Sequence, residues 1–163
     1  MLARESLNRD ASRVTDTLPK MTATPASLWL RIAAALYDVF PLLALWMATA
    51  GLALLVVHGN VDLAHPDLAW RIGLRLALLA VTAAYFVISW MRGGQTIGMR
   101  AWRLRIVGAD GGALPWPRCL LRFVVACASL GVLALGFVWC LVDRRKRAWH
   151  DLAANSALVR LAK

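Results

Sequence analysis

Long uncharged apolar runs dominate the chain. Three stretches of 19, 16 and 20 residues contain no Asp, Glu, Lys or Arg: 39–57, 76–91 and 123–142. A helix needs about 20 mostly apolar residues to cross the roughly 30 Å hydrocarbon core of a bilayer. The first and third runs reach this length alone. The second does so when Ile72 and its neighbours are added and Arg75 snorkels to the interface. The pattern therefore predicts an all-α membrane protein with three apolar segments, over about residues 28–57, 71–91 and 120–142.

The segments that connect the apolar runs differ in charge and in the spacing of their apolar residues. Residues 58–70 contain no Lys or Arg, whereas residues 92–122 carry six arginines against a lone Asp110. The positive-inside rule places the first connection outside the cytoplasm and the second inside it. Within the second, Ala101–Val107 alternates with a period of two and predicts a strand. A second β-capable stretch, Ser156–Arg160, closes the chain, and the two would form a small cytoplasmic β-element if both lie on one side of the membrane.

The third apolar segment has basic residues on both flanks. Arg118 and Arg122 open it, and Arg144–Arg147 follow it. A simple span would place the second basic cluster outside, against the charge rule. A kinked or re-entrant segment, bent near Gly131 or Gly136, would keep both flanks inside. Both arrangements remain open from the sequence, and the charge pattern favours the same-side one.

The N-terminal residues have a different composition. Residues 1–26 mix both signs of charge and show no sustained periodicity, which predicts a disordered cytoplasmic tail before a membrane domain over residues 27–161. A cleavable signal peptide would place its apolar stretch nearer the start. We therefore expect the first apolar segment to remain as a membrane span.

The amino-acid composition excludes most classes of soluble protein. Sixty per cent of the residues are hydrophobic, the mean hydropathy is +0.60 and the net charge is +10. The basic residues border the apolar runs, so the charge indicates the lipid bilayer as partner, with anionic headgroups near Arg144–Arg147, and no nucleic acid. The three cysteines have no metal-ligand or disulfide spacing, and we interpret them as small apolar residues buried in the membrane.

Several stretches together resemble the RDD family of bacterial membrane proteins, which is named for an arginine and two aspartates. The stretches are Leu30–Asp38, Gly94–Arg100, Leu104–Val107, Asp110–Gly112, Arg118 with Arg122, Asp143–Arg145 and Trp149–Ala153. The likeness covers roughly residues 28–160, although Ala154–Ala157 departs from the Gly and Thr more usual in the family. The resemblance implies a multi-pass protein of the bacterial cytoplasmic (inner) membrane with a cytoplasmic N-terminus. It places the family charges on Arg31, Asp38 and Asp151.

Arg31 and Asp38 lie two helical turns apart on one face, about 10.5 Å along the axis. An acid inside the bilayer costs about 2.5–3.5 kcal/mol unless it finds a partner. The expected partners of Asp38 are Arg122, or Gln95 and Thr96. Arg31 is expected to pair with Asp143 or Asp151. Two interpretations stay open: an ion or proton site, or an internal salt bridge that joins helices.

No enzyme chemistry stands out. Gly94–Gly98 lacks the order of a phosphate-binding P-loop and is better interpreted as a structural turn. His150 and Asp151 have no nucleophile placed with them by sequence, and we expect no catalytic residues, metal or cofactor. The resemblance implies a transport-like role and no catalytic mechanism. The leading hypothesis is a transporter or transporter component that works as a homo-oligomer or with a membrane partner. The alternative is a non-transporting scaffold or accessory subunit whose buried charges specify helix packing.

Overall fold

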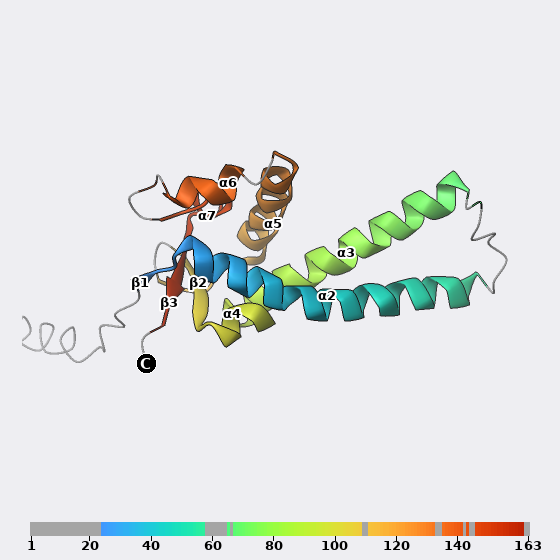
Figure 1. The fold of residues 1–163 in the computed structure, drawn as a ribbon, viewed down its shortest axis with the longest axis horizontal. Helices are drawn as coiled ribbons and strands as arrows, with labels where there is room; N and C mark the ends of the chain where they lie inside the picture. The colour runs from blue at the N-terminus through green and yellow to red at the C-terminus, as the bar shows by residue number, and fades with distance from the viewer. Residues whose placement is uncertain are drawn as a thin grey trace, which may run out of the picture.

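A hairpin of two long helices dominates the computed structural model, which describes residues 24–57, 65, 67–108, 111–132, 135–141, 143 and 146–161. Helix α2 spans Leu28–Val56 and α3 spans Leu68–Gly93. The two lie together at one end of the hairpin and diverge toward the other (Figure 1). Both are long and apolar enough to cross a membrane, and no other helix among the described residues is. The chain is thus mostly helical, with two candidate membrane spans.

The third apolar segment is not one long helix. It contains α5 at Trp116–Gly131, α6 at Leu135–Val138 and the 3₁₀ helix η1 at Trp139–Leu141. The 16 residues of α5 measure about 24 Å, which is less than the bilayer core. In Figure 1, α5 runs across the direction of α2 and α3. Of the three expected apolar segments, the first two form helices long enough to span a membrane.

Helix α5 is amphipathic in its packing. Cys119, Arg122 and Phe123 are buried, whereas Leu120 and Val124 are exposed. These positions fall three and four residues apart, so they form opposite faces of one helix. The helix thus presents a mixed polar and apolar face to the protein and an apolar face to its surroundings.

A small three-stranded antiparallel sheet lies at the end of the hairpin where α2 begins and α3 ends, which we call the base of the hairpin (Figure 1). Its strands are β1 at Thr24–Pro25, β2 at Leu104–Gly108 and β3 at Ser156–Arg160, in the order β1-β3-β2. Leu104 pairs with Arg160 and Gly108 with Ser156, which confirms the expected pairing of the central loop with the C-terminal stretch. The expected strand began too early, because Ala101 belongs to the short helix α4 at Ile97–Ala101.

Strand β1 was not anticipated from the sequence. Thr24 pairs with Arg160 and Pro25 with Val159, so these two residues of the expected N-terminal tail join the sheet. Residues 1–23, the rest of that tail, lie outside the described residues.

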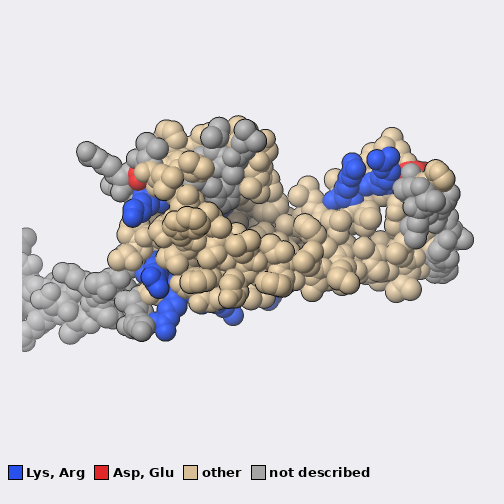
Figure 2. All heavy atoms as spheres, in the orientation of Figure 1, with Lys and Arg blue, Asp and Glu red and all other residues tan. Residues whose placement is uncertain are grey.

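The core lies where the sheet meets the base of the hairpin and α5. It includes Leu104, Ile106 and Leu158 from the sheet, with Trp90 from α3 and Phe123 from α5. Most of the length of α2 and α3 presents large apolar side chains outward. Figure 2 shows the middle of the hairpin almost free of Lys, Arg, Asp and Glu on the face in view. Burial of apolar area therefore holds the base together, whereas the rest of the hairpin offers its apolar surface to a membrane.

Candidate functional site: two buried charge centres

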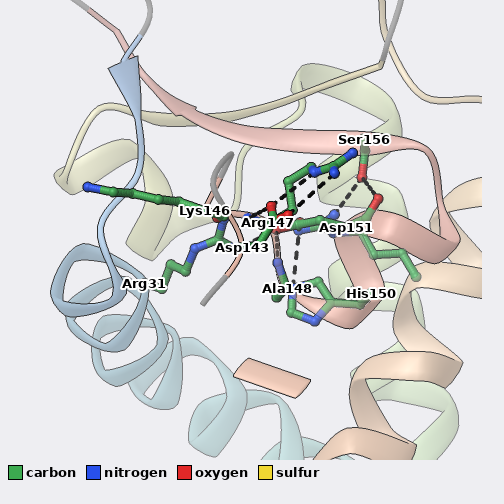
Figure 3. Close-up of polar contacts among 9 residues, drawn as sticks. Arg31, Asp143, Lys146, Arg147, Ala148, His150, Asp151 and Ser156 are labelled. Carbon is green, nitrogen blue, oxygen red and sulfur yellow. Dashed lines mark hydrogen bonds and ion pairs between the residues drawn. The ribbon is translucent and has the colours of Figure 1, made fainter. Parts of the chain in front are cut away.

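The first charge centre is built around Asp151, whose side chain is completely buried. Arg31 Nη1 lies 2.8 Å from Asp151 Oδ2, and Arg122 Nη2 lies 2.5 Å from Asp151 Oδ1. The backbone N–H of Ala148 donates to Asp151 Oδ2 at 2.9 Å. Figure 3 labels Arg31, Ala148 and Asp151 among the polar contacts of this region. One buried anion is thus held by two buried cations and a backbone donor.

This centre joins four parts of the fold. Arg31 belongs to α2, Arg122 to α5 and Asp151 to the short helix α7 at Trp149–Ala153. Arg122 Nη1 also donates to Ser156 Oγ in β3 at 2.7 Å, and Arg31 Nη2 donates to the carbonyl of Lys146 at 2.9 Å. Because the partners are far apart in sequence, the salt bridges fix the position of α2 relative to α5, α7 and the sheet.

Electrostatics keep Asp151 ionised. Burial alone would raise its pKa, but the guanidinium of Arg122, followed by that of Arg31, holds the pKa well below its usual range. The neighbouring His150 is neutral, because burial first and the charge of Arg122 second lower its pKa to about 3. A neutral, buried histidine beside a paired aspartate gives no support to a catalytic dyad.

The second charge centre is Asp38, which is 2% exposed and has three neutral donors. Tyr85 Oη donates to Asp38 Oδ1 at 2.6 Å, and Thr96 Oγ1 donates to Oδ2 at 2.6 Å. The backbone N–H of Gly98 donates to Oδ1 at 2.8 Å. No Lys, Arg or His of the described part of the chain forms a salt bridge with this carboxylate. Its partners in the described part of the chain are neutral dipoles rather than a cation.

The segment between α3 and β2 places two of these donors, Thr96 and Gly98, beside Asp38. Gly94 has a φ of +67°, and a Cβ there would lie 2.6 Å from the carbonyl oxygen of Ile106. Thr96 caps α4 by accepting from Met99 N at 3.2 Å. A Cβ at Gly98 would lie 2.0 Å from the carbonyl oxygen of Ala34, so only glycine allows α4 to approach α2 this closely. These contacts agree with the interpretation of Gly94–Gly98 as a structural turn.

The observed partners match the sequence in part. Arg31 pairs with Asp151, one of its two expected partners, and Thr96 contacts Asp38 as expected. Arg122, the alternative candidate partner of Asp38, instead binds Asp151 and Ser156 through its guanidinium. Gln95 donates to the carbonyl of Leu104 at 2.6 Å, so it secures β2 rather than binding Asp38.

Asp143 forms a separate, more exposed ion pair. Its Oδ2 lies 3.1 Å from Nε of Arg147, four residues later, and also accepts from Arg147 N at 2.9 Å. Of the basic cluster expected to meet headgroups, Lys146 and Arg147 are described, whereas residues 144 and 145 lie outside the described residues.

Sequence reasoning missed two of the groups that bind Asp38. Tyr85 lies inside an apolar run, and its hydroxyl, a hydrogen-bond donor among apolar side chains, was the signal that could have indicated a buried acceptor. Gly98 was noted for its motif but not for its backbone N–H. No group of three or more His, Cys, Asp or Glu side chains suited to a metal occurs in the described ranges.

Comparison with known proteins gives one match. The model of the RDD family matches residues 25–155, a range that contains both charge centres, including Arg31, Asp38 and Asp151. No curated protein and no solved structure matches the chain.

Proposed function

The chain belongs to the RDD family, and on this premise we propose that it is a transporter or transporter component in which Asp38 exchanges a proton or a small cation. The Asp151 centre is structural in this proposal, because its anion is already neutralised by two arginines. Asp38 is the family charge that has no cationic partner within the described structure.

The absence of a cation beside Asp38 is the observation that carries the proposal. A buried carboxylate is costly unless a counter-charge or strong hydrogen bonds compensate it. Tyr85 and Thr96 place hydroxyl groups 2.6 Å from its two oxygens. A hydroxyl both donates and accepts, so the same groups accommodate a protonated carboxyl or provide oxygen ligands to a cation. The site therefore suits a group that changes its charge state.

The same proposal places the third apolar segment on one side of the membrane. α5 is short, amphipathic and transverse to the hairpin, and the pairing of β2 with β3 requires both strands to lie on one side. We place this side, together with the N-terminus, in the cytoplasm of a bacterial inner membrane, because the basic residues of the central loop are there.

Cys127 provides a test of this arrangement. It is exposed on α5, whereas Cys119 and Cys140 are buried. A nitroxide attached to Cys127 in a protein with Cys119→Ala and Cys140→Ala should report an interfacial depth in vesicles. A reading at the bilayer centre would restore α5 as part of a third span.

A transport pathway must be enclosed by more membrane helices than one hairpin provides. Two candidate spans enclose no solute path by themselves, so the proposal requires self-association or a membrane partner. Cross-linking in native membranes, followed by mass determination, distinguishes a homo-oligomer from a mixed complex.

A scaffold is the second candidate, and one observation favours it. All three donors to Asp38 are groups of this chain, and their hydrogen bonds join α2 to α3 and α4. In this version the carboxylate specifies helix packing, and the protein serves as an accessory subunit without flux of its own.

Flux measurements in proteoliposomes containing only this protein separate the candidates. We expect proton or cation flux from the wild type, its loss in Asp38→Asn, and its retention in Asp67→Asn. Asp67 is a matched control because its carboxylate caps α3 by accepting from Trp70 N at 2.7 Å, at the far end of the hairpin. Absence of flux from the wild type, together with a homo-oligomer and no partner protein in the cross-linking experiment, would favour the scaffold.

A further inference from the structure

Two exposed arginines lie at the far end of the hairpin, away from both charge centres. Arg71 and Arg75 are in the first turns of α3. Figure 2 shows basic side chains on α3 near this end, well separated from those around the base of the hairpin. Residues four apart on a helix share one face, with Cβ atoms about 5–6 Å apart. The two guanidinium groups therefore project from the same side of α3.

Their position is unusual for a membrane protein. The positive-inside rule concentrates Lys and Arg on the cytoplasmic side, and the other described basic residues lie nearer the base of the hairpin. Neither Arg71 nor Arg75 forms a salt bridge with any described carboxylate. Asp67, the nearest acid in sequence that is described, uses Oδ1 to cap the helix at Trp70 N. Two like charges on one face thus lack a counter-charge from the described part of the protein.

The level of these arginines along the hairpin coincides with the boundary of the apolar region. The uncharged run of α3 begins directly after Arg75, at Leu76. Ile72, Leu76 and Leu79 are exposed beside the arginines and continue the surface toward the bilayer core. Trp70 lies one residue before Arg71, as expected for the interfacial aromatic belt. A bilayer whose hydrocarbon core begins at Leu76 would place the two arginines at the depth of lipid phosphates, with the exposed leucines at the depth of the acyl chains.

We propose that Arg71 and Arg75 bind the phosphate of an anionic glycerophospholipid in the leaflet at the far end of the hairpin. The planar guanidinium groups match the geometry of phosphate oxygens, and one phosphate between them removes the repulsion of the two like charges. Leu76 and Leu79 contact the acyl chains of the same lipid. The site is an addition to the proposed transport function and does not depend on it.

Lipid titration of the full-length protein in detergent, followed by native mass spectrometry, tests this site. We expect the tightest phosphatidylglycerol to bind about 30-fold more weakly to the double variant Arg71→Gln/Arg75→Gln, or about fivefold per arginine. The double variant Arg118→Gln/Arg160→Gln is the matched control, because it removes two exposed arginines from the other end of the molecule. It should bind this lipid as the wild type does.

Three results would overturn the proposal. One is equal weakening in both double variants, which would indicate general charge attraction. Another is equally tight binding of phosphatidylcholine with the same acyl chains, which would remove the preference for an anionic lipid. The third is displacement of the lipid by millimolar inorganic phosphate, which would identify a site for the free anion. Circular dichroism confirms the fold of each variant, and glutamine is a good helix former at an exposed position.

Discussion

Gly98→Ala should disrupt the junction between α2 and α4. The new Cβ would lie 2.0 Å from the carbonyl oxygen of Ala34, and real Cβ contacts almost never fall below 3.0 Å, so α4 must retreat by about 1 Å. That retreat lengthens the 2.8 Å bond from Gly98 N to Asp38 Oδ1 beyond hydrogen-bond distance. A hydrogen bond to a charged group is worth about 1.5–3 kcal/mol, and overpacking costs about 1–3 kcal/mol. The expected loss is about 2.5–6 kcal/mol.

Thermal unfolding in detergent, followed by circular dichroism, measures this loss. We expect Gly98→Ala to lower Tm by on the order of 10 °C. Gly73→Ala is the matched control, because Gly73 is also helical and a Cβ there meets nothing within 4 Å. It should unfold at or slightly above the wild-type temperature, since alanine favours helix over glycine by about 1 kcal/mol. Equal Tm values for the two variants would refute the close contact between α4 and α2.

Three further predictions concern the charge centres. Arg31→Lys should lower Tm in detergent, because one ammonium group cannot reproduce the paired contacts with Asp151 and the Lys146 carbonyl; an unchanged Tm would exclude that geometry. Thr96→Val should cost about 1.5–3 kcal/mol in the same assay, because it removes a donor to a buried carboxylate. His150 has a folded pKa of about 3, below its usual 6.5, so the unfolded state binds more protons between these values. Stability should therefore fall as pH drops from 6.5 toward 3, and His150→Gln should weaken this fall in a series of Tm measurements.

The sequence revealed the elements better than their arrangement. Apolar run length identified α2 and α3, and alternation identified β2 and β3. The extent of the helix in the third segment could not be predicted, because uncharged length does not measure helix continuity. α5 begins seven residues before the uncharged run, at Trp116, so that Arg122 falls on its buried face. The need to bury this guanidinium against Asp151 sets the position of the helix, and no local pattern reports such a long-range constraint.

The site was predictable in its charges but not in all its contacts. The motif stretches placed Arg31, Asp38 and Asp151 correctly inside the buried part of the fold. Sequence spacing could not decide which cation serves which anion, since Arg122 meets Asp151 through the packing of α5 on α7. Backbone donors such as Gly98 N carry no side-chain signal, and this donor became visible only with the approach of α4 to α2.

The central claim is that Asp151 is a fixed structural anion whereas Asp38 is an exchangeable one, and paired Asn substitutions test it most directly. Asn at position 38 retains an acceptor for Tyr85 and Gly98, and its amide donates to the Thr96 hydroxyl, so Tm in detergent should change by only a few degrees. Asp151→Asn leaves two buried guanidinium groups without their anion, which should cost about 3–5 kcal/mol, or on the order of 10 °C. An equal loss of Tm in the two variants, or a larger loss in Asp38→Asn, would contradict this division of roles.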